Sequence, residues 1–465
     1  MEHLTAIVLA AGRGTRMLSE TPKVLHRLLD EPLLSYPLRL LDEIGVAKKL
    51  VVVSGDEDGD RVAAALAGFP GVDWPRQQVP RGTAAAVAAA LAALPDESGD
   101  VLIVCGDVPL LRPETLKSFY HRHRQSRAGL SVLTAVLSEG GSYGRVLVDA
   151  GERPIAIVEA RDATAEELEV RRINSGTYLV EIGLLRRALA TIGCDNAQGE
   201  YYLTDIVAFA CREGVATSCF DVADEREILG VNTRADLVAL EDILARRLVD
   251  SWLRRGVTVH SPATVRIGPL VECGRDVEIE PGAALLGRVR VGCRSRIGAG
   301  SQIRETVIGD DVVVKPYSVL EEVTVGNAAQ IGPFARLRPG TEIGPEAKIG
   351  NFVETKKARF GRGAKASHLA YIGDAEVGEE SNLGAGTITC NYDGFRKFKT
   401  RIGKRVFVGS DSQLVAPVTL ADDALVGAGS TVTRDVSENV LVTTRVRQKE
   451  LAGRGMAWRR QREEE

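Results

Sequence analysis

Residues 266–303, RIGPLVECGRDVEIEPGAALLGRVRVGCRSRIGAGSQI, carry an apolar side chain at every sixth position. The series begins at Ile267 and continues through Cys273, Ile279, Leu285, Val291, Ile297 and Ile303. Neither an α-helix nor a flat sheet has a period of six. A hexapeptide β-solenoid does, because each short strand sends one side chain to the axis before the chain turns a corner. The period therefore favours a solenoid over an ordinary β-meander.

The same period returns twice downstream with a changed phase. The positions are Val325, Ile331, Leu337, Ile343 and Ile349, and then Ile402, Val408, Leu414, Leu420, Val426 and Val432. The count breaks near residues 304–324 and again within residues 371–403. In the second break, CNYDGFRKFKT (residues 390–400) is expected to leave the solenoid as a loop, and such loops are common sites of function.

Residues 1–230 follow a different pattern. The segments TAIVLAAG, KLVVVSGD and DVLIVCGDVP are nearly continuous apolar runs that end at glycine. Strands of this kind are usually buried on both faces of a parallel sheet. An alanine-rich helical segment, RGTAAAVAAALAAL, lies between the second and third runs. This alternation predicts an α/β domain of Rossmann-like type with a mostly parallel sheet.

One long helix is predicted between the two regions, over residues 234–255. Leu240, Leu244, Leu248 and Trp252 fall four residues apart on one stripe of it. The 465 residues exceed one ordinary core. We therefore predict an α/β domain over 1–230, a linker helix within 231–255, a β-solenoid over 256–440, and a tail over 441–465.

Composition excludes several classes of function. A formal net charge of -4 argues against a general nucleic-acid binder. The seven cysteines form no CxxC pair and are odd in number, which argues against zinc and a disulfide framework and suits a reducing cytoplasm. No signal-type segment or long apolar run is visible, so we expect a cytoplasmic protein with no membrane partner.

A candidate phosphate site follows the first predicted strand, in AIVLAAGRGTRMLSETPK (residues 6–23). Gly12 and Gly14 allow positive φ and close backbone approach, so that successive N–H groups form an anion cradle. Arg16 and Lys23 add positive charge suited to a triphosphate. The spacing is neither a Walker A loop nor a dinucleotide fingerprint, and a simple structural turn is the alternative.

Asp107 follows the third apolar run, at the expected carboxyl edge of the sheet. A carboxylate beside phosphates is a natural Mg²⁺ ligand, because Mg²⁺ prefers a few protein oxygens together with phosphates and waters. A turn aspartate is the alternative.

The whole string LAAGRGTRM…TPK resembles the signature of sugar-1-phosphate nucleotidylyltransferases, although many members have Lys at the position of Arg13 and Gly at that of Ala84. The resemblance implies that Arg16 and Lys23 bind phosphate and promote catalysis, and that Asn232 joins Asp107 as a metal ligand. It also assigns contacts to the nucleotide and sugar: Leu9, Ala10, Gly12 and Gly14 in the loop, Gln77, Gly82 and Thr83 to the uracil base, and Gly144, Glu159 and Asn174 to the sugar. The implied reaction is nucleotidyl transfer by positioning and charge, without a covalent nucleophile.

His368, within KASHLAYIGDAE, is the candidate general base of the solenoid. A lone histidine is more often structural. Here it lies where the repeat is disrupted, with lysines and amides around it that suit an anionic substrate carrying a nucleophile.

The run NFVETKKARFGRGAKASHLAYIGDAEVGEESNLGAGTITCNYDG closely resembles the bacterial bifunctional N-acetylglucosamine-1-phosphate uridylyltransferases / glucosamine-1-phosphate acetyltransferases, and the likeness extends over about residues 4–445. It implies a left-handed parallel β-helix that assembles as a homotrimer, with His368 deprotonating the substrate amine. The implied contacts to the amino-sugar phosphate are Arg338, Lys356, Tyr371, Asn382 and Lys397; those to acetyl-CoA are Asn391, Tyr392, Ser410, Ala428 and Arg445. Near Arg445 the family's SRVPQ is TRVRQ here.

The resulting hypothesis is a bifunctional enzyme. It acetylates glucosamine-1-phosphate with acetyl-CoA, and then transfers uridylyl from UTP to N-acetylglucosamine-1-phosphate with Mg²⁺. One alternative is a monofunctional sugar-1-phosphate nucleotidylyltransferase whose β-helix serves only assembly. A structural solenoid would need neither the isolated histidine nor the inserted loop. A non-catalytic scaffold is a third possibility, which the intact phosphate loop disfavours.

Overall fold

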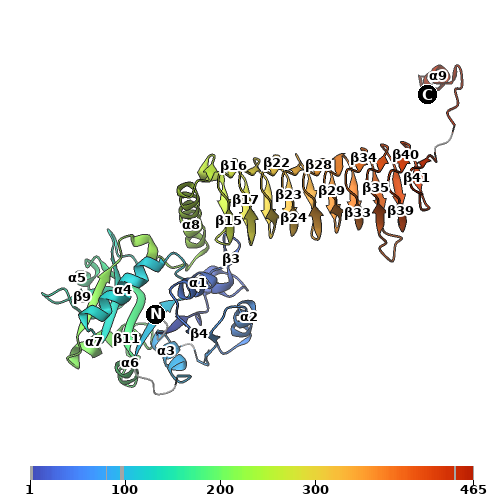
Figure 1. The fold of residues 1–465 in the computed structure, drawn as a ribbon. Helices are drawn as coiled ribbons and strands as arrows, with labels where there is room; N and C mark the ends of the chain where they lie inside the picture. The colour runs from blue at the N-terminus through green and yellow to red at the C-terminus, as the bar shows by residue number, and fades with distance from the viewer. Residues whose placement is uncertain (1–3, 80, 95–98, 445–446, 464–465) are drawn as a thin grey trace. The chain divides into compact units, whose positions relative to one another are not determined.

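The computed structural model describes residues 4–79, 81–94, 99–444 and 447–463. The chain divides into two compact units, residues 1–244 and residues 245–465. Each unit is built on its own sheet system (Figure 1). Among the described residues, no helix has the length and apolar character needed to cross a bilayer.

The first unit is built on a ten-stranded mixed sheet. At its centre, strand β1 (Thr5–Leu9) pairs in parallel with both β4 (Lys48–Ser54) and β7 (Asp100–Cys105). Strand β11 (Arg172–Glu181) continues the sheet antiparallel to β7. The remaining strands are β5 (Val72–Asp73), β6 (Arg76–Gln77), β8 (Leu130–Val136), β9 (Arg145–Val148), β10 (Pro154–Val158) and β12 (Thr217–Asp221).

Both faces of this sheet are buried, as the apolar runs predict. Along β1, Ile7 belongs to one apolar cluster, whereas Ala6 and Val8 belong to another, because successive side chains point to opposite faces. The helices are α1 (Ser35–Glu43), α2 (Glu57–Ala65), α3 (Thr83–Leu91), α4 (Pro113–Ser126), α5 (Ala165–Leu168), α6 (Ile182–Leu189) and α7 (Asp205–Arg212). Short 3₁₀ turns η1 (Thr15–Met17), η2 (Lys23–Leu25) and η3 (Glu225–Ile228) and the hairpin β2 (Arg27–Leu28)–β3 (Glu31–Pro32) complete the unit.

The predicted long helix is α8 (Arg234–Arg254). Leu240, Leu244 and Trp252 are buried on it as expected. Leu248, on the same stripe, is only partly buried, and Val249 is the fully buried neighbour. Val249 and Trp252 belong to the apolar core of the second unit, so packing against the solenoid selects the buried stripe at this end of the helix.

The second unit is a left-handed parallel β-helix with three sheets of short strands. Sheet 1 contains β13 (Thr258–Val259), β16 (Glu278–Ile279), β19 (Arg296–Ile297), β22 (Val313–Val314), β25 (Gln330–Ile331), β28 (Lys348–Asn351), β31 (Lys365–His368), β34 (Asn382–Leu383), β37 (Phe407–Val408), β40 (Leu425–Val426) and β42 (Leu441–Val442). Sheet 2 contains β14 (Arg266–Ile267), β17 (Ala284–Leu286), β20 (Gln302–Arg304), β23 (Val319–Glu321), β26 (Arg336–Leu337), β29 (Glu354–Lys356), β32 (Tyr371–Gly373), β35 (Ile388–Cys390), β38 (Gln413–Val415) and β41 (Thr431–Val432). Sheet 3 contains β15 (Val271–Cys273), β18 (Val289–Val291), β21 (Val307–Ile308), β24 (Val323–Val325), β27 (Thr341–Ile343), β30 (Arg359–Phe360), β33 (Ala375–Val377), β36 (Thr400–Ile402) and β39 (Val418–Leu420).

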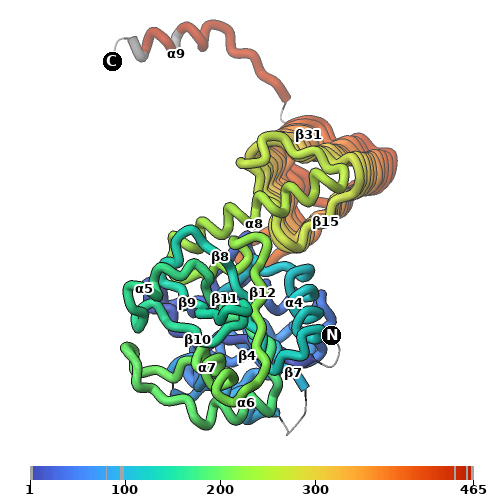
Figure 2. The backbone as a smooth tube through the Cα atoms, turned by 90° about the vertical axis from the view of Figure 1, so that its left-hand side faces the viewer, coloured from blue at the N-terminus to red at the C-terminus, as the bar shows by residue number. Residues whose placement is uncertain are grey.

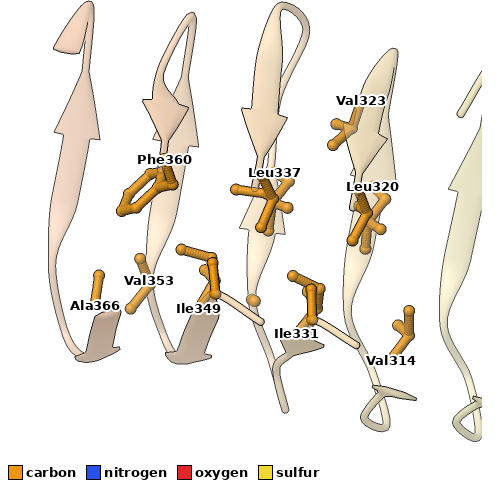
Figure 3. Close-up of a cluster of buried hydrophobic side chains, with 14 of the residues drawn as sticks. Val314, Leu320, Val323, Ile331, Leu337, Ile349, Val353, Phe360 and Ala366 are labelled. Atoms are coloured by element: carbon orange, nitrogen blue, oxygen red, sulfur yellow. The ribbon is translucent and has the colours of Figure 1, made fainter. Parts of the chain in front are cut away.

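Equivalent strands stack in register, so that one apolar residue per strand enters a continuous core. Val314, Ile331 and Ile349 follow one another on successive coils of sheet 1 (Figure 3). Seen along the stack, the coils lie behind one another (Figure 2). We call the bend between sheets 1 and 2 the first corner, and the bend between sheets 2 and 3 the second corner.

Both breaks in the six-residue count occur at the second corner. Within residues 304–324 the interval is shortened twice. Buried Ile303 and Ile308, and again Leu320 and Val325, are one residue closer in sequence than the period requires. Glu305 and Glu322 take left-handed φ values of 46° and 50° in these tightened turns. The later break is an insertion. Ser295 Oγ accepts from the backbone N–H of Val312, 17 residues on, whereas the equivalent bond from Val406 to Ser381 spans 25. The extra residues form the predicted loop, which protrudes near β39 (Figure 1).

Outside the coils, the second unit adds a 3₁₀ turn, η4 (Pro262–Thr264), and a helix, α9 (Arg454–Glu463), in the predicted tail. The six-residue pattern gave no indication of α9.

Candidate active sites

The first unit contains a cavity of about 440 Å³ at the carboxyl ends of β1 and β7. Eight of the predicted site residues line it: Leu9, Ala10, Gly12, Lys23, Gln77, Gly82, Thr83 and Asp107. Val24, Cys105 and Glu200 also line it and had not been predicted. This edge is where open α/β sheets bind ligands, because strand ends and the loops after them meet there.

The two loop glycines differ in conformation. Gly14 has a left-handed φ of 61°, and a Cβ at this position would lie 2.5 Å from Lys23 Cβ. Gly12 is not in the left-handed region, so the expectation of positive φ there is wrong. A Cβ on Gly12 would meet nothing within 4 Å, which leaves its backbone open toward the cavity.

A polar network joins four of the predicted residues. Lys23 Nζ donates to Asp107 Oδ2 at 2.5 Å and to Asn232 Oδ1 at 3.2 Å. The Arg16 guanidinium also donates to Asn232 Oδ1, at 2.8 Å. A backbone bond from Val231 N–H to Asp107 C=O, 2.9 Å long, holds the two segments together. Two side-chain oxygens therefore converge on one cationic group.

Two of the residues predicted to contact the base, Gly82 and Thr83, pack against residues 200–203. Gln77 Nε2 donates to Gly82 C=O at 3.2 Å, and Leu203 N–H donates to Thr83 Oγ1 at 3.0 Å. Gly82 has a φ of 99°, and a Cβ there would lie 2.6 Å from the carbonyl oxygen of Tyr201. Glycine is therefore required by close backbone packing.

The three predicted sugar contacts come together beside a second cavity. Asn174 N–H donates to Gly144 C=O at 2.9 Å, and a Cβ on Gly144 would lie 3.5 Å from Glu159 Oε2. Glu159 lines a separate cavity of about 440 Å³ together with Asp162 and other polar residues. Burial raises the pKa of the Glu159 carboxyl, with nearby Asp162 and Asp205 adding to the effect. Gly144, Glu159 and Asn174 do not line the cavity that contains Lys23.

In the second unit, three predicted residues share the first corner. His368 lies two residues after buried Ala366, and Ser410 and Ala428 occupy the same place after Val408 and Val426. All three side chains are exposed. Gly429 N–H donates to Ser410 C=O at 2.8 Å, which joins two of the coils directly.

A cluster of cations occupies the second corner. Arg338 and Lys356 directly follow the paired residues Leu337 and Thr355 on neighbouring strands. Lys397, in the inserted loop, approaches Lys356 and lowers its pKa, with Arg338 adding to the effect. Arg338 also bonds to Glu354 Oε1 at 2.8 Å. Repulsion between clustered cations is relieved by an anion, so the arrangement suits a phosphate.

Two polar side chains meet beside these cations. A Cβ on Gly373 would lie 2.5 Å from Tyr371 Oη and 2.9 Å from Asn391 Nδ2. Asn391 is buried and donates to Asp374 Oδ2 at 2.6 Å, so Asp374 fixes its orientation. Sequence reasoning missed Asp374, although it lies in the quoted YIGDAE run.

The remaining predicted residues are spread over neighbouring positions. Asn382 is half-buried on sheet 1, beside Lys365 and Phe407. Tyr392 is exposed in the loop, pairs with Lys397 and donates to Gly394 C=O at 2.5 Å. Arg445 lies outside the described residues.

Comparisons with known proteins cover both units. Residues 6–171 match the MobA-like NTP transferase domain family. Residues 322–357 match the bacterial transferase hexapeptide family (six repeats), and residues 399–434 match the hexapeptide repeat of succinyl-transferase.

Curated relatives match nearly the whole chain. The bifunctional protein GlmU of Anaeromyxobacter dehalogenans (strain 2CP-C) is 48% identical over 89% of this chain and 85% of its own. GlmU of Sorangium cellulosum is 46% identical over 97% and 95%, and GlmU of Alkalilimnicola ehrlichii is 43% identical over 99% and 97%. Because this identity extends across both the nucleotidyltransferase-like unit and the hexapeptide repeats, the chain belongs to the GlmU family of bifunctional proteins.

Proposed function

We propose that the two sites described above carry out the two reactions of this bifunctional enzyme. The β-helix transfers acetyl from acetyl-CoA to the amine of glucosamine-1-phosphate. The first unit then transfers uridylyl from UTP to N-acetylglucosamine-1-phosphate and releases pyrophosphate. The observation that carries the proposal is that one chain holds a phosphate loop next to Lys23 and Asp107, and an exposed histidine near a cluster of cations.

The acetyl site lies along the outer face of sheet 2. His368 precedes this face at the first corner, Tyr371 begins its strand there, and Lys356 ends the neighbouring strand. Strands rise about 3.3 Å per residue, so the two ends of the face lie roughly 7–10 Å apart. An amino-sugar phosphate can span this distance, with its amine toward His368 and its phosphate toward Arg338, Lys356 and Lys397.

Acetyl transfer requires a neutral amine. His368 accepts the proton that the amine loses as nitrogen attacks the thioester carbonyl, and the C–S bond breaks to release coenzyme A as thiolate. Asn391, held by Asp374, orients the reacting groups. Tyr392, Ser410 and Ala428 contact acetyl-CoA, together with Arg445.

Uridylyl transfer relies on position and charge. A phosphate oxygen of the sugar phosphate attacks the α-phosphorus of UTP, the bond to the β-phosphate oxygen breaks, and pyrophosphate leaves. Arg16 and Lys23 neutralise charge on the phosphates. Gln77, Gly82 and Thr83 contact the base, and Gly144, Glu159 and Asn174 contact the sugar.

Mg²⁺ fits the residues of this first site. Asp107 and Asn232 each direct an oxygen toward Lys23 Nζ, so a cation is already accommodated between them. No group of three or more His, Cys, Asp or Glu side chains that could hold a metal ion occurs in the described parts of the chain. Mg²⁺ takes few protein oxygens and completes its shell with phosphates and water, and Asp107 and Asn232 can supply two such oxygens. When bound, the ion would neutralise charge on the triphosphate.

A homotrimer is supported by an exposed apolar column at the first corner. Tyr317, Phe334 and Phe352 stack on successive coils with ring centroids 5.3 and 5.4 Å apart, and exposed Leu369 follows them. All four adopt left-handed φ values between 46° and 58°. Light scattering should give a mass near three chains of 49.9 kDa, and Phe334→Glu should reduce it. A wild-type monomer would contradict the trimer.

We also assign the enzyme to a reducing compartment such as the cytoplasm. All seven cysteines are free, which is the usual state in that compartment.

A product assay tests both reactions. Purified protein receives glucosamine-1-phosphate, acetyl-CoA, UTP and Mg²⁺, with each omitted in turn, and products are identified by mass. We expect N-acetylglucosamine-1-phosphate without UTP, and UDP-N-acetylglucosamine only in the complete mixture. Failure to form the acetylated sugar would favour the monofunctional nucleotidylyltransferase.

A further inference from the structure

Arg145, the first residue of β9, is a buried cation surrounded by main-chain carbonyls. Only 3% of the residue is exposed. Its guanidinium donates to Gly140 C=O at 3.2 Å, to Gly141 C=O at 3.1 Å and, closely, to Tyr143 C=O. Nε donates to Leu168 C=O at 3.4 Å. Among the described residues, no carboxylate forms an ion pair with it, which is unusual for a buried charge.

The segment before β9 is shaped around this guanidinium. Residues 138–144 read SEGGSYG, a composition with little conformational preference of its own. A Cβ on Gly140 would lie 2.5 Å from Arg145 Cζ, so the backbone approaches more closely than any other residue would allow. Gly141 adopts a left-handed φ of 50°. Arg145 therefore supplies the fixed centre around which the loop folds.

The loop leads directly to the proposed sugar contacts. Gly144 precedes Arg145, accepts from Asn174 N–H at 2.9 Å and lies against Glu159. In the sheet, Arg145 pairs with Val158 on β10 and with Ile173 on β11. These partners directly precede Glu159 and Asn174. Of the three sugar contacts, Gly144 is therefore the sequence neighbour of Arg145, and Glu159 and Asn174 are the sequence neighbours of its two partners in the sheet.

We propose that Arg145 is a positioning residue for the sugar subsite of uridylyl transfer. Its guanidinium holds the carbonyls of Gly140, Gly141 and Tyr143, and thereby fixes Gly144 against Glu159 and Asn174. The inference rests on the proposed sugar role of these residues. Since Arg145 does not line the cavity that contains Lys23 and Gln77, its loss should weaken sugar-phosphate binding and leave UTP binding largely unchanged.

The test compares Michaelis constants in full-length variants, with pyrophosphate release as the assay. Arg145→Met should raise KM for N-acetylglucosamine-1-phosphate at least tenfold while KM for UTP stays within twofold. Arg145→Lys should be intermediate, because an ammonium cannot reproduce the planar fork of donors. Millimolar guanidinium should partly restore the sugar-phosphate KM of Arg145→Ala. Acetyl transfer by the same molecules serves as an internal control for concentration and integrity.

Arg172→Met is the matched control. Arg172 begins β11 in the same sheet, but its partners are the carboxylates of Glu152 and Asp221. It should lower stability without changing the KM ratio. An equal rise of the KM for UTP and the KM for sugar phosphate in Arg145→Met would overturn the inference. Folded Arg145→Lys and Arg145→Ala variants with an unchanged KM for sugar phosphate would also overturn it, and so would a raised KM in Arg145→Ala that guanidinium does not lower. If Glu159→Ala also leaves the KM for sugar phosphate unchanged, the sugar subsite itself is misassigned. If Glu159→Ala raises this KM and the Arg145 variants do not, only the positioning role of Arg145 fails.

Discussion

Replacing Gly14 with alanine should damage the first unit and its reaction together. Gly14 has a φ of 61°, a conformation that L-residues with a Cβ adopt at a cost. The added Cβ would lie 2.5 Å from Lys23 Cβ, 3.3 Å from Cγ and 3.4 Å from Cδ. The contact is with the stem of Lys23 near the backbone, so the collision can be relieved only by moving the residue that bonds to Asp107.

The expected magnitude follows from two terms. Left-handed backbone costs an alanine roughly 1–2 kcal/mol relative to glycine. Overpacking of this kind typically costs about 1–3 kcal/mol. The free energy of unfolding of the first unit should therefore fall by roughly 2–5 kcal/mol. For catalysis, a displacement of Lys23 by about 1 Å is expected to lower uridylyl transfer roughly 100-fold.

Thermal unfolding and pyrophosphate release measure the two effects. Gly12→Ala is the matched control, since its Cβ would meet no atom within 4 Å and its φ is not left-handed. It should leave unfolding unchanged, and any loss of activity it causes would report ligand approach to the backbone. Acetyl transfer should survive in both variants. If Gly14→Ala unfolds like the wild type and keeps its kcat, the strain argument is refuted.

Three other outcomes are expected. His368→Ala should lower acetyl transfer at least 100-fold, the lower range for removal of a general base, with uridylyl transfer nearly unchanged; loss of both activities in folded protein would contradict two separate sites. Asp107→Ala, or chelation of Mg²⁺, should stop uridylyl transfer and spare acetyl transfer, as followed by product mass; UDP-sugar synthesis without metal would refute the metal role. Burial raises the pKa of Glu159 in the folded state, so the carboxylate destabilises that state increasingly as pH rises through the folded pKa. At pH values above the folded pKa, Glu159→Gln should therefore raise the Tm of the first unit. At pH values below 4.5, the ordinary pKa of the carboxyl, it should give no gain in Tm. Equal gains at every pH would exclude this cause.

The sequence predicts the architecture well where burial repeats at a constant interval. The six-residue period identifies the β-helix because each coil buries the same side of each strand, as Val314, Ile331 and Ile349 illustrate. The prediction weakens where the interval changes. The shortened turns at Glu305 and Glu322 depend on backbone conformation rather than on side-chain type, so they appear in the sequence only as a lost phase. Val249 replaces Leu248 in the core for a similar reason, since packing against the solenoid decides which side of α8 is buried.

The site residues also differ in how well the sequence predicts them. Charged or catalytic side chains such as Lys23, Asp107 and His368 can be proposed from their type and their place after a strand. Residues that act through the backbone leave a weaker signal. Asp374 matters because it orients Asn391, and Arg145 because it binds carbonyls, and neither role is visible without the fold. Gly12 and Gly14 look alike in sequence, yet only Gly14 has the left-handed backbone expected of both.

The exposed apolar column lies beside the proposed acetyl site, so the proposed assembly and the proposed catalysis meet at one corner of the β-helix. At equivalent positions in other coils, the chain has Gly300, Gly386 and Gly429, all with positive φ. Placing Tyr317, Phe334, Phe352 and Leu369 there adds backbone strain of about 1 kcal/mol or more per residue and leaves large apolar side chains 46–61% exposed. Stacking of the three rings within one chain returns part of these costs, and burial of the side chains against another copy would add a further gain. Leu369 directly follows His368 in this column. An interface that covers the column would therefore border the proposed catalytic base, which lies exposed on the surface of one chain.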